Sequence, residues 1–212
     1  MAKRFRLADL PVKDEKLVIA RREQVAQAAL FLFLDRGYHS TTVREIAQAV
    51  RLSVGSLFNY FRSKEEILHF LYDQAHQAME EAIQEVLDLS LDPEAAFRTA
   101  FGRFLQLVDR YQNYVLLVYQ EFKSLDAGAK KLVIDRERRI AEIFQRIVEA
   151  GIAAGRFAPR AMPITVHDIL VLGHVWALRR WALRDSFPFE AFQSHQTELA
   201  VAMLKGKPGD GA

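Results

Sequence analysis

The sequence predicts an all-α protein in which a small N-terminal three-helix domain, containing a helix-turn-helix, precedes a larger C-terminal helical domain. Three observations lead to this class. Apolar residues recur three and four positions apart over most of the 212 residues, and short Gly, Pro or polar stretches separate the periodic segments. No segment alternates apolar and polar residues as a half-buried strand does.

The composition is that of an ordinary globular protein. Half of the residues are hydrophobic and 26% are charged, so a chain of this length buries a substantial core in one or two domains. The absence of cysteine excludes a disulfide framework, a thiol nucleophile and a thiolate metal site. No apolar run reaches the roughly 18 residues of a membrane helix. No signal peptide is recognisable, so we expect a cytoplasmic protein without a membrane segment.

The first predicted element is a flexible basic arm at residues 1–16, which carries five lysines and arginines as well as Pro11. Such an arm can reach into a DNA minor groove, or it is a solvated tail without a fixed partner. A helix follows from about Leu17 to Arg36, with Gly37 as its stop signal.

The segment from Thr42 to Lys64 predicts two short helices joined by a tight turn. Apolar residues fall at i, i+3, i+4 and i+7 on both sides of a break at 51–53. Neither helix is long enough to be stable alone, so their apolar faces must pack on each other and on the preceding helix. The apolar residues are Val43, Ile46, Ala47 and Val50 before the break, and Val54, Leu57, Phe58 and Phe61 after it.

Capping residues mark the helix starts in this segment. Thr42 with Glu45 forms a capping box, Ser53 caps the next helix, and Ser63 with Glu66 forms a second capping box. The side chains left outward on the middle helix are small or polar, and such a face can enter a DNA major groove. They are Gly55, Ser56, Asn59 and Tyr60.

A long helix from Ser63 to about Leu89 exceeds what the small domain needs, so we expect it to link the domains at 17–64 and 65–204. Asp92 as a cap and Pro93 at the first helical position then start the next helix. The further helices are expected at 93–110, 111–124, 127–154, 163–184 and 188–204, with a disordered tail at 205–212.

From about Glu23 to Leu71 the chain resembles the TetR family of bacterial transcriptional repressors. Where that family usually has a small residue and a tyrosine, this chain has Arg51 and Phe58. If position 51 is left-handed, Arg51 strains the turn by about 1 kcal/mol. Phe58 lacks a hydroxyl that often reaches a phosphate in the family. The matching strings are Ala28-Ala29-Leu30-Phe31, Gly37-Tyr38-His39-Ser40-Thr41-Thr42-Val43, Ile46-Ala47, Ser53-Val54-Gly55-Ser56-Leu57-Phe58-Asn59-Tyr60-Phe61 and Ser63-Lys64-Glu65-Glu66.

The charge distribution and the resemblance together imply a double-stranded DNA partner. Residues 1–64 hold 12 Lys and Arg against 6 Asp and Glu, and the remaining residues hold 17 against 21. A basic segment is the expected footprint of phosphate binding. We expect Arg44 to bind a guanine through its two-donor fork. Base edges are assigned to Ser53, Val54, Gly55, Ser56 and Asn59, and phosphates to Thr42, Tyr60 and Lys64.

The second half is interpreted as a domain that binds an effector. The helices at 93–124 carry more aromatic residues than closing a bundle requires; most are expected in the core, and a few should line a cavity. Candidate ligand-binding residues are Phe104, Tyr111, Tyr114, Tyr119, His167, His174 and Trp176.

The effector itself stays open, with a weak preference for a molecule that has an anionic head. Aromatic walls favour an apolar body, and arginines could receive an anionic head, as on a fatty acid or an acyl thioester. Glu121 or Asp168 could equally receive a lipophilic cation, in which case the arginines are surface residues. The arginines are Arg138, Arg139, Arg179, Arg180 and Arg184.

The last two helices predict a homodimer through residues 163–204. Gly173 and Ala177 stand four apart, so another helix can approach closely there. Apolar residues nearby exceed what one helix pair covers within a monomer, and the resemblance implies a dimer on a two-fold symmetric operator. These residues are Leu170, Trp181, Ala182, Phe187, Phe189, Phe192 and Leu199.

An enzyme is disfavoured, since no nucleotide-binding, nucleophile-elbow or zinc-protease motif occurs and no cofactor is implied. His167, Asp168 and His174 are the best metal candidates, but two histidines on an apolar helix are more often polar members of a core. We therefore predict a dimeric repressor released by a small apolar ligand. The alternatives are a DNA-binding regulator without an effector and one with a lipophilic cationic effector. The sequence leaves open the operator, the regulated genes and the sign of regulation.

Overall fold

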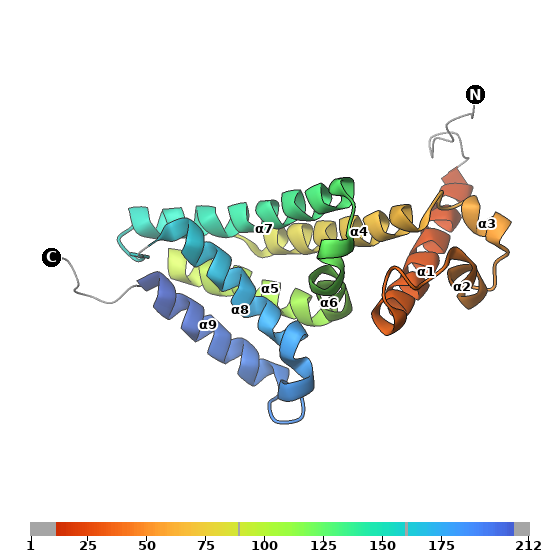
Figure 1. Ribbon diagram of the computed structural model, residues 1–212. Coiled ribbons are helices and arrows are strands. Elements are labelled where there is room, and N and C mark those ends of the chain that lie inside the picture. The colour runs from red at the N-terminus through yellow and green to blue at the C-terminus, as the bar shows by residue number, and fades with distance from the viewer. Residues whose placement is uncertain (1–11, 89, 160, 206–212) are drawn as a thin grey trace. The chain divides into compact units, whose positions relative to one another are not determined.

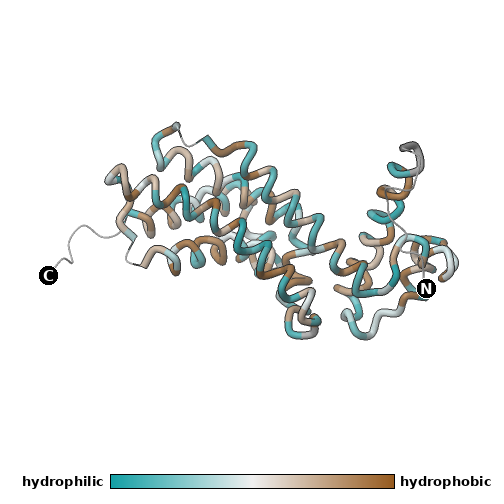
Figure 2. Tube along the Cα trace, turned by 90° about the horizontal axis from the view of Figure 1, so that it is seen from above, coloured by the Kyte–Doolittle hydropathy of each residue, from teal (hydrophilic) through white to brown (hydrophobic). Residues whose placement is uncertain are grey.

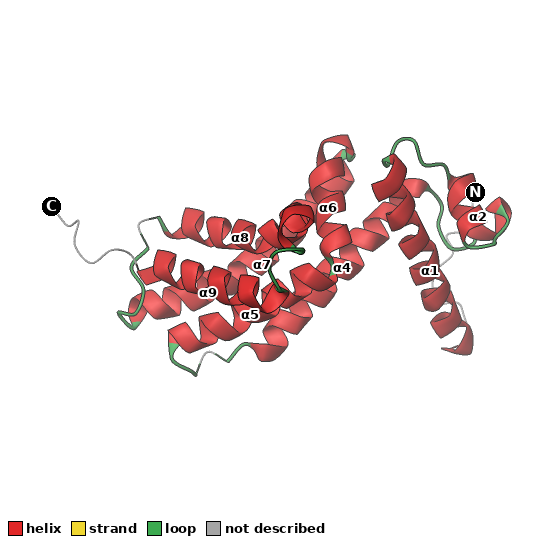
Figure 3. Ribbon diagram, turned by 90° about the horizontal axis from the view of Figure 1, so that it is seen from below, coloured by secondary structure: helices red, strands yellow, loops and turns green. Residues whose placement is uncertain are grey.

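A computed structural model describes residues 12–88, 90–159 and 161–205. These residues form helices joined by loops, and none of them lies in a strand (Figure 3). The predicted all-α fold is therefore confirmed. The chain divides into two compact units, Met1–Tyr72 and Asp73–Ala212. Across the described residues, no helix combines the length and apolar character that crossing a membrane requires.

The first unit contains α1 (Val12–Arg36), α2 (Val43–Ala49), α3 (Val54–Phe58) and the beginning of α4 (Lys64–Val86) (Figure 1). Its helices pack around apolar side chains from each of these elements, so the predicted inward faces of the short helices are largely correct. The buried side chains include Val25, Ala29, Phe33, Ile46, Ala47, Leu57, Phe61, Ile67 and Leu68.

Helix α1 begins at Val12, rather than at about Leu17. Residues 12–16, which we expected in the arm, are helical because Pro11 is the last helix breaker before α1 and the charged residues after Val12 tolerate a helix. Residues 1–11 lie outside the described residues, as do residues 206–212 of the expected tail; Lys205 is the last residue of α9.

The second unit is built around α5 (Pro93–Arg110), which packs against α7 (Ala127–Ala153), α8 (Met162–Leu183) and α9 (Phe189–Lys205). Helix α6 (Gln112–Glu121) and the 3-10 turn Phe122–Ser124 follow α5, and α6 packs on α8. Hydrophobic and hydrophilic residues are interspersed along these helices (Figure 2), as expected for helices with one buried face.

Phenylalanines fill the centre of this unit. Phe97 and Phe101 of α5 stack with ring centroids 5.4 Å apart, and Phe144 of α7 meets Phe104 edge-on at 5.7 Å. All four rings are almost completely buried. Most aromatic residues of α5 therefore belong to the core, as expected.

Gly173 lies inside this core. A Cβ atom on Gly173 would stand 2.3 Å from Cε1 of Phe104, and Ala177 on the same face is 2% exposed. The small residues therefore let α8 approach α5 of the same chain. Our expectation that they face another subunit is not what the structure shows, because the ring of Phe104 already fills that space.

Two helices end in the same hydrogen-bond motif with different residues at its left-handed position. After α2, Arg51 donates its N–H to Gln48 O (3.1 Å) and Leu52 donates to Ala47 O (2.8 Å). After α7, Gly155 and the residue that follows it make the equivalent bonds to Ile152 O and Gly151 O, at 3.0 and 2.8 Å. This is the Schellman motif, whose left-handed residue is usually glycine. Arg51 adopts φ 56°, against 68° for Gly155.

Candidate nucleic-acid interface and effector cavity

The helix-turn-helix is set by its caps and by a short α3. Ser53 Oγ accepts the N–H of Ser56 at 3.0 Å and fixes the start of α3. Beyond Phe58 the chain continues as turns, with Tyr60 and Phe61 both donating to Leu57 O. The predicted apolar spacing extends to Phe61, and its side chain is indeed buried, but the helix proper ends earlier.

The outward face of α3 carries Gly55 and Asn59, as predicted, together with Phe58. We assigned Phe58 to the inward face, and this is wrong, since its side chain is 47% exposed. Leu57 and Phe61 point into the core, and Phe58 follows Leu57 by about 100° around the helix. The predicted DNA-reading face therefore includes an aromatic ring. Ser56 and Tyr60 are half-buried at its edges.

At the start of α2, the capping box is present as predicted. Thr42 Oγ1 accepts the N–H of Glu45 at 3.3 Å and donates to Glu45 Oε2 at 2.8 Å, and the Thr42 N–H binds the same oxygen. These bonds from Thr42, followed by the charge of Arg36, hold the pKa of Glu45 below its usual value. Glu45 thus occupies the positive end of α2, and Thr42 meets a phosphate only if that carboxylate moves. Arg44, in the same first turn of α2, is exposed.

Lys64 is held inside the unit. Its ammonium donates to Tyr38 O at 2.6 Å and Thr41 O at 2.9 Å, and it stands 4.3 Å from the centroid of the Tyr38 ring. The Tyr38 hydroxyl in turn donates to Glu65 Oε1 at 3.0 Å. An ammonium has three N–H donors, and those of Lys64 point to carbonyl oxygens of the loop between α1 and α2. The structure therefore favours a positioning role for Lys64 over the phosphate contact that we predicted.

A small cavity lies in the second unit where five helices meet. Its volume is about 10 Å³, which is roughly the space of one water molecule. The lining is apolar and aromatic apart from a few polar groups. It consists of His76, Met79, Phe104, Tyr114, Val115, Val118, Tyr119, Glu137, Ile140 and His174, from α4, α5, α6, α7 and α8.

Four of the predicted ligand-binding residues, Phe104, Tyr114, Tyr119 and His174, meet at this cavity. The Tyr119 hydroxyl and His174 Nδ1 are 3.0 Å apart and hydrogen-bonded. The His174 ring lies 5.7 Å from the Phe104 ring. Tyr114 reaches across to the ring of His76, with centroids 5.3 Å apart.

The polar side chains of the cavity are shifted in pKa. Burial lowers the pKa of His76 to about 4, and the charge of Arg136 acts in the same direction. Burial likewise lowers the pKa of His174 to about 4, so both rings are neutral at pH 7. Burial of part of the Glu137 carboxyl group raises its pKa to about 7, although 39% of the side chain stays exposed at the edge of the cavity. Burial also raises the pKa of Tyr119, and the charge of Glu137 adds to this.

The other three candidates lie elsewhere. Trp176 is 4% exposed and donates from Nε1 to Asp109 Oδ1 at 2.7 Å, with its ring 5.0 Å from that of Phe192, so it ties α8 to α5 and α9. Tyr111 is half-buried at the junction of α5 and α6, and His167 is exposed on α8. Within the described part of the chain, no group of three His, Asp or Glu side chains is placed to hold a metal ion.

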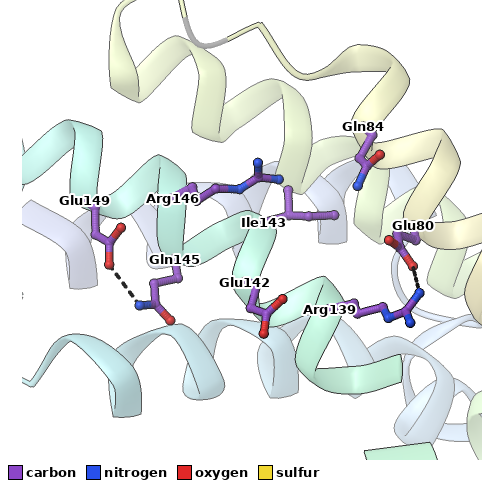
Figure 4. Close-up of a pocket in the computed structure, with 8 residues that line it drawn as sticks. All are labelled: Glu80, Gln84, Arg139, Glu142, Ile143, Gln145, Arg146 and Glu149. Carbon is purple, nitrogen blue, oxygen red and sulfur yellow. Dashed lines mark hydrogen bonds and ion pairs between the residues drawn. The ribbon is translucent and has the colours of Figure 1, made fainter. Parts of the chain in front are cut away.

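The arginines considered for an anionic head do not line the cavity. Arg138, Arg139, Arg179 and Arg184 are exposed, and Arg180 binds Gln112. Arg139 lines a separate open groove of about 560 Å³ between α4 and α7, where it faces Glu80 at 4.0 Å (Figure 4). The groove walls are mostly charged or amide side chains of both signs, and Gln145 is bonded to Glu149 in the same view. An apolar ligand fits the cavity better.

Sequence reasoning missed His76 and Glu137. Each occupies an inward position of a long amphipathic helix: His76 lies between Tyr72 and Met79 on α4, and Glu137 is four residues after Val133 on α7. A polar residue at a position where the helical spacing demands an apolar one was the available signal.

Comparison with known proteins matches both units. Residues 25–70 match the family described as bacterial regulatory proteins, tetR family, and residues 90–183 match the tetracyclin repressor-like C-terminal domain. The HTH-type transcriptional regulator HbdR of Aromatoleum sp. (strain CIB) is 31% identical over 190 residues, covering 90% of this chain and 83% of its own. The HTH-type transcriptional repressor KstR2 of Mycolicibacterium smegmatis is 26% identical, covering 87% and 89%.

Solved structures share the fold. A regulatory protein of the tetR family from Rhodococcus RHA1 superposes with a TM-score of 0.81 at 22% identity, over 88% of this chain and 98% of its own. The ketosteroid transcriptional regulator KstR2 of Mycobacterium tuberculosis gives 0.74 at 21% identity, over 88% and 96%. With a helix-turn-helix in the first unit, a matching second unit and a relative 31% identical over nine-tenths of the chain, this protein belongs to the TetR family and is a DNA-binding transcriptional regulator rather than an enzyme.

Proposed function

We propose that the protein is a homodimeric repressor that binds a two-fold symmetric operator and is released by a small, largely apolar molecule. The observation that carries this proposal is that α4 supplies both the last helix of the DNA-binding unit and a wall of the aromatic cavity. Ile67 and Leu68 of α4 are buried in the first unit, and His76 and Met79 line the cavity in the second.

The DNA-reading surface consists of α3 and the exposed side of α2. Gly55, Phe58 and Asn59 would approach base edges, with Ser53, Val54 and Ser56 beside them. Arg44 and Tyr60 would bind at the edges of this surface, and Thr42 after displacement of Glu45. Helix α3 contains no Lys or Arg, so affinity must come from flanking charges and should fall steeply with salt.

Dimerisation is supported by apolar side chains that the monomer leaves exposed on α8, on α9 and in the loop between them. Trp181 is 73% exposed, the largest such fraction in this group. Scattered exposed apolar residues are ordinary, but a group of them on neighbouring helices marks an interaction surface. The group is Ile164, Val171, Trp181, Phe187 and Leu199.

Release from the operator would follow if the effector binds one conformation of the protein more tightly than the DNA-binding one. In the described conformation the cavity holds no more than about one water-sized group. A larger effector must therefore part the helices around it, including α4, and it lowers DNA affinity only as far as it prefers that rearranged state. Relatives named a ketosteroid transcriptional regulator and a fatty acid metabolism regulator protein support an apolar effector.

The test is selection of bound duplexes from a random DNA pool at moderate salt, with Arg44→Ala as the reading-face variant and Arg138→Ala as a control of equal charge change in the second unit. We expect wild type and Arg138→Ala to enrich one palindromic site. Arg44→Ala should bind that site at least about tenfold more weakly, as the loss of a bidentate guanine contact would cause. Enrichment of no sequence by wild type would refute the proposal.

A further inference from the structure

The described lining of the cavity contains one side chain, His76, whose buried polar atoms have no hydrogen-bond partner. His76 is 2% exposed, and neither of its ring nitrogens has a hydrogen-bond partner among the described residues. The carboxyl group of Glu137 lies close to it, with Nε2 and Oε1 3.7 Å apart. That separation is too long for a hydrogen bond. Buried groups of this kind are costly unless something else binds them.

One oxygen atom of a ligand could form hydrogen bonds with both His76 Nε2 and the Glu137 carboxyl group. An atom about 2.8 Å from His76 Nε2 and from Glu137 Oε1 closes a triangle across their separation, and the cavity has room for roughly one such atom. A neutral histidine and a carboxyl group that titrates near pH 7 present both donors and acceptors. The Tyr119 hydroxyl on His174 adds a further polar group nearby.

The charged side chains around the cavity favour an uncharged oxygen group over an anionic one. No Lys or Arg belongs to its described lining, whereas Glu137 does. Arg136 stands on the same helix as Glu137, but its guanidinium is bonded to Asp73 and lies 3.8 Å from Glu80, outside the cavity. A carboxylate, or the phosphates of an acyl-CoA, would therefore enter next to the carboxylate of Glu137, while the nearby charge of Arg136 is already paired with Asp73.

We infer that the effector is an apolar molecule carrying an uncharged hydroxyl or carbonyl oxygen, which binds between His76 and Glu137. The body of the effector packs against Met79, Phe104 and Ile140. This inference rests on the proposed function, because it specifies the chemistry of the molecule that releases the repressor. It also reverses the weak preference for an anionic head that the sequence suggested, since the arginines lie outside the cavity.

The test uses one scaffold with different head groups on the full-length protein at pH 7.5. The probes are 4-hexylphenol, 4-hexylacetophenone, hexylbenzene, 4-hexylbenzoate and 4-hexylbenzylamine, measured by calorimetric titration. We expect the phenol or the ketone to bind about tenfold more tightly than hexylbenzene, as one hydrogen bond to a buried group provides. The benzoate should bind more weakly than the neutral polar probes, because it would bring a second negative charge next to Glu137.

Three variants assign the preference to the cavity. His76→Leu should bind the phenol and hexylbenzene within about twofold of each other, because the hydrogen-bonding group is gone. Met79→Leu changes the lining without removing a polar atom and should keep the tenfold preference. Glu137→Gln retains hydrogen-bonding capacity without the charge, so it should keep the phenol preference and bind the benzoate more tightly than wild type does. Should His76→Leu fail to fold, the Glu137→Gln result decides.

Several results would overturn the inference. These are tighter binding of the benzoate or the amine than of both neutral polar probes, a preference that survives His76→Leu, or no binding by any probe. Operator binding is measured on the same preparations. A selected operator with no head-group preference refutes the inference and leaves the repressor intact. A clear preference without any selected operator refutes the proposed function instead.

Discussion

Arg51 offers the sharpest test of how this sequence departs from its family. It occupies the left-handed position of the Schellman motif after α2, with φ 56°, where an L-residue costs roughly 1–2 kcal/mol. Replacement by glycine removes this cost, but glycine also loses more backbone entropy on folding, by roughly 0.5–1 kcal/mol. The hydrogen bonds from positions 51 and 52 to Gln48 O and Ala47 O are made by the backbone and survive the change. We therefore expect Arg51→Gly to stabilise the protein by about 1 kcal/mol.

The matched control is Arg51→Ala, which removes the same charge and keeps a Cβ atom in the left-handed conformation. For a chain of this length, about 1 kcal/mol corresponds to a rise in Tm of about 2–4 °C. Calorimetric and urea melts should show this rise for Arg51→Gly and no gain for Arg51→Ala. Equal stability of the two variants would refute the assignment of strain to the backbone. Both should lose the same amount of DNA affinity if the guanidinium contacts a phosphate, with the salt slope reduced by about one.

Four further predictions concern other parts of the molecule. Gly173→Ala should destabilise by about 1–3 kcal/mol in urea melts, because its Cβ would stand 2.3 Å from Cε1 of the buried Phe104; an unchanged midpoint would contradict the packing. Folding raises the pKa of Glu137 from near 4.5 to about 7. The contribution of this side chain to the free energy of unfolding is therefore fully present below pH 4.5 and is lost as the pH rises through 7. Glu137→Gln should accordingly be more stable than wild type at pH 8, by about 1 kcal/mol after allowance for screening at a partly exposed side chain, and equal near pH 4; a constant difference across pH would show another cause. Phe58→Tyr should leave Tm unchanged, since the ring is 47% exposed, and should tighten operator binding about two- to fivefold in electrophoretic titrations through a new phosphate hydrogen bond; weaker binding would place the ring against an apolar base edge. Trp181→Glu should shift sedimentation from dimer to monomer at micromolar protein, because it places a charge in the proposed apolar interface, and an unchanged dimer would locate the interface elsewhere.

The sequence predicts the helices well because their signals are local. The capping box at Thr42, the Asp92-Pro93 start of α5 and the stop at Gly37 act within a few residues of where they stand. A left-handed conformation at position 51 entered the sequence argument only as a condition, and the structure has φ 56° there.

The cavity could be predicted only in part. The chemistry of Phe104, Tyr114, Tyr119 and His174 makes them candidates from the sequence, and they converge because five helices pack in one particular arrangement. Helical spacing states which residues face inward but not which inward faces meet, so Trp176 was grouped with them although its indole binds Asp109. The pairing of His76 with Glu137 cannot be predicted from the sequence, because an isolated polar residue on an apolar helix face gives no indication of its partner across the core.

The bonds of Lys64 have a mechanical consequence. Because its ammonium holds the carbonyls of Tyr38 and Thr41, and the adjacent Glu65 holds the Tyr38 hydroxyl, the first turn of α4 is fastened to the loop that leads into α2. The 23 residues of α4 make a rod about 34 Å long at 1.5 Å per residue. Within the first unit, the bonds of Lys64 join the carbonyls before α2 to the first turn of this rod, so these two parts of the helix-turn-helix unit are expected to move together.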